Sequence, residues 1–348
     1  MKIALDAVGG DYGFAPNLEG LRHAMADHKD IEQFLLVGPV DEMKAELPKY
    51  DLSADDPRLE FVQASQLVEM HEPSSIALRK KRDSSITVAA TLLKEGRADA
   101  MISAGHTGAS VAANVVINRM LPGVERPGIA AVFPSPHGQF VMLDVGANVD
   151  ATAQQLGQYA ILGEAYTRLV LGVEKPRVGL MSVGAEDGKG NKLTKAAGEI
   201  LGQLPMNYVG NVEGHDLFGG GVDVVVCDGF VGNAVLKSCE SLAKAITTIL
   251  KENLQKSTMR TLGAALAKGA FAELKEMMDH EETGGAPLLG INGVCIIAHG
   301  SSSAKSIRNA FRVASDMVRK EVNRQVAEKL VESRDAFAAD GEKGDQDV

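Results

Sequence analysis

The chain has 348 residues, of which 45% are apolar and 24% charged, a balance typical of folded globular proteins and not of disordered or fibrous ones. Its net charge of −10 and its aromatic content of 4% favour neither electrostatic nor base-stacking binding of nucleic acid. Three cysteines without CxxC spacing fit a reducing cytoplasm and exclude a disulfide framework. No apolar run has the length of a secretory signal or a membrane-spanning helix.

Short apolar runs that end in glycine or acidic turns alternate with helical periods along the chain. Strands are predicted at 2–5, 34–37, 98–103, 141–143, 178–183, 223–227 and 294–298. Helices are predicted at 107–120, at 153–171, after 229 and after 300. This alternation predicts an α/β fold with a mostly parallel sheet covered by helices on both faces, in three layers. Such sheets bind ligands at the carboxyl ends of their strands, where the glycine-rich turns lie.

Two segments differ from this pattern. Between about 250 and 280, basic residues lie off a stripe of apolar residues that recur at helical spacing. The stripe consists of Met259, Leu262, Leu266, Ala270, Leu274 and Met277. Such a stripe suits a membrane interface and equally a core or dimer contact. Residues 333–348 are polar and rich in Gly, Asp and Lys, which predicts a disordered tail. We therefore expect one large α/β catalytic domain over 1–332.

Seven glycine-rich turns share a chemistry that suits an anion. Glycine permits close backbone approach to a ligand, and free amides at a helix start attract negative charge. The turns are DAVGGD (6–11), SAGHTGAS (103–110), DVGAN (144–148), GAEDGKGN (184–191), GNVEGHD (210–216), DGFVGNAVLK (228–237), and TGGAPLLG with AHGSS (283–290, 298–302). Each one alone is ordinary turn chemistry. Their recurrence indicates an anion or phosphate pocket.

Several familiar motifs are missing from the sequence. It contains no GxxxxGK[ST], no GxGxxG after the first strand, no HExxH and no GxSxG. The histidines are scattered, and Cys227 ends an apolar strand, which favours burial over activation as a nucleophile. We expect neither a metal nor a cofactor.

The turns resemble those of the PlsX-type phosphate acyltransferases, the acyl-acyl-carrier-protein:phosphate acyltransferases of bacterial phospholipid synthesis. The resemblance covers about Met1 to Glu332 in order, through ALDAVGGD, RKKRDSS, ADAMISAGHTGA, ERPGIA, LDVGAN, EDGKGN, GNVEG, DVVVCDGFVGN and GGAPLLGINGVCIIAHGSS. The chain departs from the usual pattern at His106, where the family has Asn, and at Val8, where it has Met. It also lacks a second acidic residue near Ala185.

The resemblance implies that inorganic phosphate accepts a long-chain acyl group from acyl carrier protein, giving acyl phosphate for phospholipid synthesis. It further implies a fold like phosphotransacetylase and the isocitrate and isopropylmalate dehydrogenases. A homodimer is implied too, loosely associated with the inner face of the membrane through about 250–280. Acyl carrier protein is acidic, so docking on this acidic chain needs a local basic patch. The densest basic groups are Arg79, Lys80, Lys81 and Arg82, and on the last long helix Arg308, Arg312, Arg319 and Lys320.

The reaction needs no side-chain nucleophile, because phosphate is one already. The enzyme has to hold an anion against a thioester and stabilise a developing oxyanion. We predict that Lys189 supplies charge to the phosphate or oxyanion and that Asn233 donates a hydrogen bond. Lys189 equally suits a solvated turn, and Asn233 a helix N-cap. Further binding candidates, all at strand-end turns, are Asp6, Gly9, Gly10, Gly105, His106, Thr107, Gly108, Asn148, Asn191, Asp228, His299, Ser301 and Ser302.

Three other functions remain open. A short-chain phosphotransacetylase acting on acyl-coenzyme A would share the fold and the phosphate site, but it would not need the amphipathic segment. A scaffold that binds acyl carrier protein without catalysis would carry His106 as its marker. A dehydrogenase fits less well, because the dinucleotide turn is missing.

Overall fold

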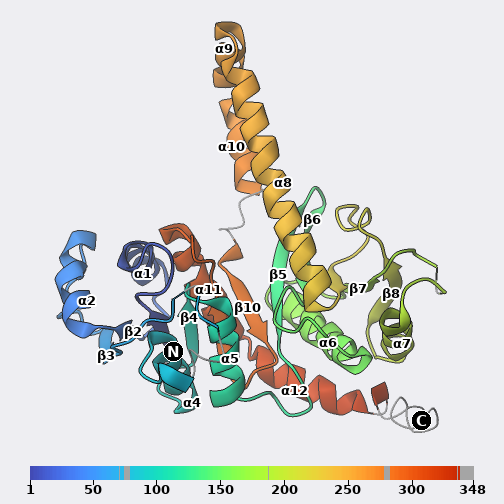
Figure 1. Cartoon of the computed structure of the whole chain (residues 1–348), viewed down its shortest axis with the longest axis horizontal. Helices are drawn as coiled ribbons and strands as arrows, with labels where there is room; N and C mark the ends of the chain where they lie inside the picture. Colours follow the sequence, from blue (N-terminus) through green and yellow to red (C-terminus); the bar gives the residue numbers. More distant parts are fainter. Residues whose placement is uncertain (70, 74–78, 187, 278–282, 335, 338–348) are drawn as a thin grey trace.

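A computed structural model describes residues 1–69, 71–73, 79–186, 188–277, 283–334 and 336–337. An 11-stranded sheet runs through them in the order β3-β2-β1-β4-β11-β10-β5-β6-β9-β7-β8 (Figure 1). Its strands are β1 (Lys2–Asp6), β2 (Gln33–Gly38), β3 (Leu59–Gln63), β4 (Ala100–Ser103), β5 (Gly128–Ser135), β6 (Gly138–Leu143), β7 (Arg177–Met181), β8 (Asn207–Val212), β9 (Val224–Val226), β10 (Ala286–Leu289) and β11 (Val294–Ile297).

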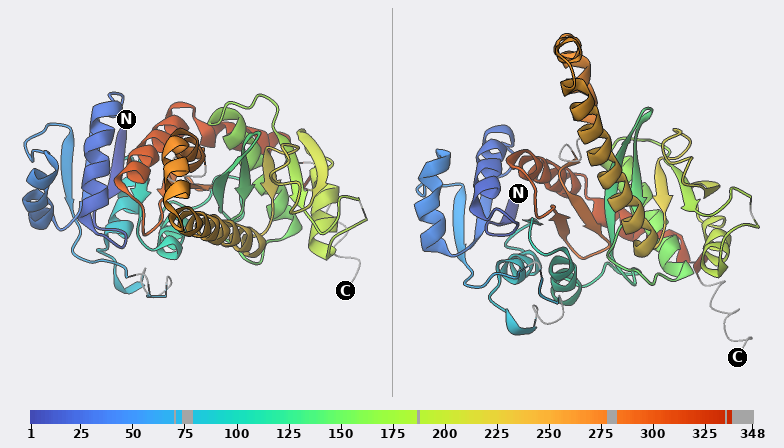
Figure 2. Two further views of the ribbon diagram at one scale, coloured as in Figure 1. Left: turned by 90° about the horizontal axis from the view of Figure 1, so that it is seen from above. Right: turned by 45° about the horizontal axis from the view of Figure 1, so that its top comes forward.

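Helices cover both faces of this sheet, which confirms the three-layer prediction (Figure 2). One face carries α1 (Phe14–Asp27), α2 (Val40–Glu46), a 3-10 turn η1 (Leu47–Tyr50), α6 (Ala153–Leu169), α7 (Lys192–Leu201), α11 (Ala304–Arg319) and α12 (Val322–Glu332). The other face carries α4 (Ser85–Lys94), α5 (Thr107–Ile117) and the beginning of α8 (Gly229–Gln255).

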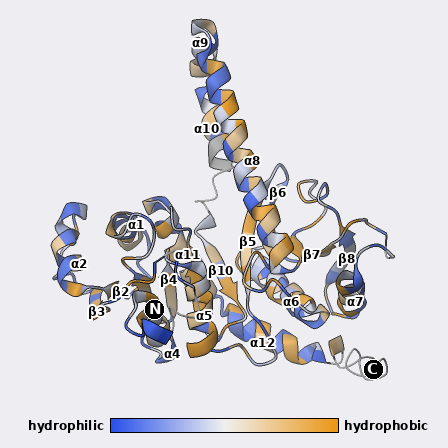
Figure 3. Cartoon of the chain, in the orientation of Figure 1, coloured by the Kyte–Doolittle hydropathy of each residue, from blue (hydrophilic) through white to orange (hydrophobic). Residues whose placement is uncertain are grey.

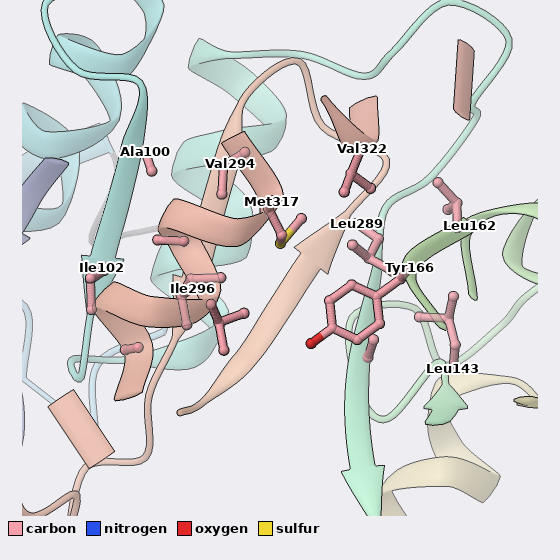
Figure 4. Packing of buried hydrophobic residues seen from close by; sticks show 14 of the residues in the cluster. Ala100, Ile102, Leu143, Leu162, Tyr166, Leu289, Val294, Ile296, Met317 and Val322 are labelled. Atoms are coloured by element: carbon pink, nitrogen blue, oxygen red, sulfur yellow. The ribbon is translucent and has the colours of Figure 1, made fainter. Parts of the chain in front are cut away.

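The core is built by the alternation of side chains along the buried strands. In β1, Ile3 and Leu5 enter the cluster on one face, while Ala4 enters the cluster on the other. Figure 4 shows the first cluster, where Tyr166 of α6 and Met317 of α11 lie over the central strands. Because both faces are covered, these strands read in the sequence as continuous apolar runs.

The direction of the strands reverses in the middle of the sheet. β10 is antiparallel to β11 and to β5, and β5 is antiparallel to β6, whereas the pairs on either side are parallel. The strands β1, β4 and β11 therefore end at one edge of the sheet, and β6, β7 and β9 at the opposite edge. A uniformly parallel sheet would have gathered all the predicted turns at one edge. The sequence analysis missed β3, β5, β8 and β10, two of which make this reversal.

A helical arm projects from the body. α8 leaves the sheet, and α9 (Thr258–Leu266) and α10 (Lys268–Met277) fold back beside it (Figure 1). Apolar side chains on the arm are exposed, with Met259 at 77% and Leu266 at 84%. Figure 3 shows hydrophobic stretches along the arm. A core role within this chain is thus excluded for that part of the stripe. The stretch expected to be helical up to 280 also includes 278–280, which lie outside the described residues.

The C-terminal boundary lies later than composition indicated. Ser333 is 2% and Ala336 8% exposed, and the ring of Phe337 approaches Gly157 of α6. Ala336 and Phe337 therefore still pack on the body, and the rest of the predicted tail, 338–348, lies outside the described residues. Among the helices that are described, none is long and apolar enough to cross a bilayer.

Candidate active site

The first group of predicted residues lies where β1, β4 and β11 end. Asp6 is fully buried; its Oδ1 accepts the Gly9 amide at 3.0 Å and its Oδ2 accepts the Ser103 hydroxyl at 2.7 Å. Burial raises the pKa of Asp6 above its ordinary value, while the hydrogen bonds from Ser103 and Gly9 oppose that shift. These contacts tie the β1 turn to the end of β4. A contact between Asp6 and substrate stays a prediction.

The turn after β1 has no room for side chains. A Cβ at Gly9 would lie 2.5 Å from Asp6 Oδ2 and 2.8 Å from the Gly105 amide nitrogen. Gly10 has a φ of 101°, and the next amide, of Asp11, donates to the Gly300 carbonyl at 2.7 Å. The predicted glycines 9, 10 and 105 thus bring three strand-end turns together.

His106 caps the helix that follows β4. Its Nδ1 accepts the Ala109 amide at 3.1 Å, a bond that the side-chain oxygen of an asparagine can also accept. With Nδ1 accepting, a neutral ring carries its proton on Nε2, which makes that nitrogen a donor at the helix start. The amides of Thr107 and Gly108 lie in the first turn, where a helix leaves N–H groups without partners inside the helix. The start of α5 therefore presents donors suited to an anion.

The turn after β11 has its own internal hydrogen bonds. His299 and Ser301 are exposed, with Nδ1 and Oγ 2.8 Å apart. Ser302 is buried, and its hydroxyl accepts a hydrogen bond from Ser306 at 3.2 Å. Exposure leaves His299 and Ser301 accessible to a ligand, while Ser302 packs under the turn.

A second group lies at the opposite edge, around Asp144 at the end of β6. Its Oδ1 accepts the amides of Ile129, Gly146 and Ala147 at 2.9, 3.0 and 3.0 Å. Its Oδ2 accepts the amide of Asn148 at 2.7 Å. Burial raises the pKa of Asp144, and the four amides oppose that shift. The carboxylate holds the loop after β6 closed. Sequence reasoning did not nominate Asp144, although LDVGAN, an acidic residue between an apolar run and a glycine turn, carries the signal.

Asn148 belongs to the same loop and is held from α6. Its side-chain amide donates to Gln155 Oε1 at 2.7 Å and to the Tyr159 hydroxyl at 3.2 Å. Both hydrogens of the amide are therefore engaged inside the protein. Any contact of the Asn148 side chain with phosphate requires these bonds to change.

The beginning of α8 lies against this loop. Asp228 is the N-cap, because its Oδ1 accepts the amides of Phe230 and Val231 at 2.9 Å. The capping alternative for Asn233 is thereby excluded: Asn233 lies a full turn further on, since Asp228 already satisfies the first amides. Asn233 is exposed, and a Cβ on Gly146 would lie 3.7 Å from its Cβ. Asn233 thus borders the loop that Asp144 organises.

Lys189 and Asn191 lie in the turn after β7, at the edge where β6 also ends, with β9 between the two strands. Asn191 caps α7, accepting the Thr194 amide at 2.9 Å. Lys189 is exposed, its amide donates to the Glu186 carbonyl, and its side chain lies beside Gly184. Within the described chain, no hydrogen bond or ion pair joins Lys189 to Asn233 or to the start of α5. Its catalytic role stays a prediction.

A groove of about 370 Å³ connects the first two groups. Gly108 and the face of α5 form one wall, and Gly146 and Ala147 form part of the other, with Arg126 also lining it. Four steps from strand to strand separate β4 from β6 in the sheet. Neighbouring strands are rotated by roughly 20–25° in a twisted sheet, so β6 is rotated by roughly 80–100° relative to β4. This rotation lets a helix on one half reach a loop on the other. Sequence reasoning missed Arg126, although it stands in the ERPGIA stretch.

Cysteine and metal chemistry find little support in the described residues. Burial raises the pKa of the Cys227 thiol well above its ordinary value and that of Cys295 to about 12, so both stay protonated. Within the described chain, no cluster of three His, Cys, Asp or Glu side chains is placed to hold a metal.

Known proteins resemble this chain in sequence and fold. A family model described as fatty acid synthesis protein matches residues 1–325. The phosphate acyltransferase of Geobacter sulfurreducens is 46% identical over 330 residues, covering 95% of this chain and 94% of the relative. That of Akkermansia muciniphila is 45% identical over 336 residues, covering 95% and 96%.

Solved structures with a similar fold are far more distant in sequence. The EutD phosphotransacetylase of Staphylococcus aureus has a TM-score of 0.56 at 15% identity, covering 91% of this chain and 94% of its own. A branched-chain phosphotransacylase of Enterococcus faecalis has a TM-score of 0.56 at 15% identity, covering 91% and 99%. These two show the fold alone, while the family match and the full-length relatives decide membership. The chain therefore belongs to the family of fatty acid synthesis proteins whose curated members are named phosphate acyltransferases, the PlsX-type family that its turns resemble.

Proposed function

We propose that this chain transfers a long-chain acyl group from acyl carrier protein to inorganic phosphate, using the groove between α5 and the β6–α6 loop. The carrying observation is that one groove is lined both by Gly108, at the donor-rich start of α5, and by Gly146, the neighbour of Asn233. Residues 1–332 then act as one catalytic unit, because the two groups come from opposite halves of one sheet.

The reaction requires the protein to position phosphate against the thioester and to stabilise the oxyanion that forms. A phosphate oxygen attacks the thioester carbonyl carbon, and a C–O bond forms as the carbonyl oxygen becomes negative. When the C–S bond breaks, its electron pair leaves with sulfur, which takes up a proton to give the free carrier thiol. Amides of α5 and the Asn233 side chain are donors suited to the phosphate and to the oxyanion. No protein nucleophile takes part.

The acyl carrier protein docks beside the groove, on the basic run before α4. Arg79, Lys80 and Arg82 are exposed, and α4 packs against α5. The basic residues of α11 suit this role less well, because Arg308 pairs with Asp27 and both Arg312 and Arg319 pair with Asp316. Lys81 of the same run pairs with Glu72, whereas for Arg79, Lys80 and Arg82 no ion pair is seen within the described residues, so an acidic partner gains more from these three.

The arm supplies contacts to a second copy and to the membrane. On α8 the exposed Leu242, Ile246 and Ile249 are spaced four and three apart, a stripe suited to packing against the same helix of a second copy. At the tip, the exposed Met259 and Leu262 lie near basic side chains, a composition suited to an anionic lipid surface. The protein is then a cytoplasmic homodimer that releases acyl phosphate at the inner face of the membrane.

The deciding experiment measures phosphate-dependent release of free thiol from palmitoyl carrier protein, with hydroxylamine to trap acyl phosphate. Release that rises with phosphate and yields trapped acyl groups supports the proposal. Activity on acetyl-coenzyme A alone favours the short-chain alternative. Carrier binding without release, by folded protein, favours the scaffold.

A further inference from the structure

One face of α5 is apolar and turned away from the sheet. Its residues line the groove at spacings of three and four, at Gly108, Val111, Ala112, Val115 and Val116. The sheet-facing positions between them, Ala109 and Ala113, are buried in the core. Of the lining face, Val111 also packs against this cluster, whereas Val116 is 61% exposed. The open end of the groove at Val116 is therefore not needed for packing α5 on the sheet.

Arg126 is the charged residue of this lining. It is exposed, and within the described residues no hydrogen bond or ion pair engages its guanidinium. It shares the groove with Gly146, whose neighbour is Asn233. Arg126 thus supplies a cation to a groove whose other lining residues are apolar, and the donor Asn233 lies beside its Gly146.

We propose that the α5 groove binds the acyl phosphate itself, with Arg126 engaging the phosphate and the valine face of α5 contacting the acyl chain. An apolar groove with a single guanidinium complements an amphiphile with one anionic head. The groove's volume of about 370 Å³ lies in the range of small-molecule sites, and Val116 leaves it open for longer chains. This inference rests on the proposed function, since it names the residues that bind the phosphate and the acyl chain of its product.

Direct binding tests the groove without catalysis. Dodecyl phosphate, below its micelle concentration, is titrated into the full chain by calorimetry. We expect Arg126→Met and Val116→Glu each to weaken binding by about 10- to 100-fold, the effect of losing a charge-assisted hydrogen bond or of placing a carboxylate against the chain. Val209→Glu is the matched control, because Val209 is 45% exposed on β8, away from the groove, and its binding should equal that of the wild type.

Chain-length selectivity gives a second test. Ala112→Phe fills the groove, so KM for palmitoyl carrier protein should rise about 10- to 100-fold, as expected when a few methylene groups lose apolar surroundings. KM for octanoyl carrier protein and the apparent KM for phosphate should change little. Arg126→Met should instead raise the KM for phosphate.

The outcomes separate this inference from the proposed function. A wild type that releases no thiol overturns the proposed function. A wild type that transfers acyl groups, with Arg126→Met and Val116→Glu binding dodecyl phosphate normally, overturns the groove assignment alone. Dissociation of an oligomer by Val116→Glu, seen by light scattering, would show that a second copy fills the groove and would overturn it too.

Discussion

Gly232 offers the sharpest test of how α8 meets the candidate active site. It is buried in the first turns of α8, and a Cβ there would lie 2.0 Å from the Asp144 carbonyl oxygen and 2.9 Å from Cys227 Sγ. Real Cβ contacts are not shorter than 3.0 Å, so Gly232→Ala forces a shift of about 1 Å. Asp144 cannot give way easily, because its amide donates to the Cys227 carbonyl at 2.9 Å inside the sheet.

The beginning of α8 therefore has to move. The loss in free energy of unfolding has two parts, the overpacking at Gly232 and the hydrogen bond that the movement strains. Overpacking typically costs about 1–3 kcal/mol, and the bond from the Gly229 amide to the Asn148 carbonyl, worth about 1 kcal/mol, is strained as well. We expect Gly232→Ala to lower the free energy of unfolding by about 3 kcal/mol. The adjoining Asn233 moves with the helix, and a 1 Å misplacement costs about 10²-fold in rate.

Urea unfolding followed by far-UV circular dichroism gives the stability, and thiol release gives the rate of the folded variant. Gly263→Ala is the matched control, because Gly263 lies in helix α9 with nothing within 4 Å of a Cβ. The control should be neutral or gain up to about 1 kcal/mol in helix propensity. A Gly232→Ala protein with wild-type midpoint and rate would refute the close approach of α8 to Asp144.

Three further predictions concern charge and the arm. Lys189→Ala should lower kcat/KM about 10²–10³-fold without changing the unfolding midpoint, whereas Lys192→Ala, also exposed, should not; equal rates for both would remove Lys189 from the chemistry. Leu262→Glu should reduce sedimentation with anionic phospholipid vesicles while leaving acyl transfer in solution intact, and undiminished sedimentation would contradict a membrane role for the tip. Hydrogen bonds from Arg177 hold the pKa of Asp223 in the folded state below its ordinary value. The pair therefore stabilises the folded state fully when the pH is above the ordinary carboxyl pKa. This stabilisation is lost as the pH falls through the lowered pKa of the folded state. Asp223→Asn should flatten that acid dependence of the unfolding free energy; a variant with the wild-type acid profile would show that the pair does not set it.

Interactions between residues close together in the chain allowed several strands and the apolar stripe of the arm to be predicted from the sequence. β1, β2 and β11 appear as apolar runs ended by glycine or acidic turns, because each strand is buried on both faces. The cap of α8 was not predicted, since the N-cap alternative was given to Asn233 and the structure places it at Asp228. The stripe at 259–266 was visible because helical spacing is a property of neighbouring residues.

Which turns meet was decided only by the tertiary structure. β5 and β10 pair with strands far away in the chain, and these pairings reverse the sheet and place the β6 and β1 turns at opposite edges. The groove joining α5 to Gly146, and Arg126 within it, depend on the twist accumulated between the two halves. The sequence alone determined the fold class, seven of the strands and the family, because these depend on short-range patterns and on motifs. Which donors share a site depends on strand pairing between distant segments, which no local pattern encodes.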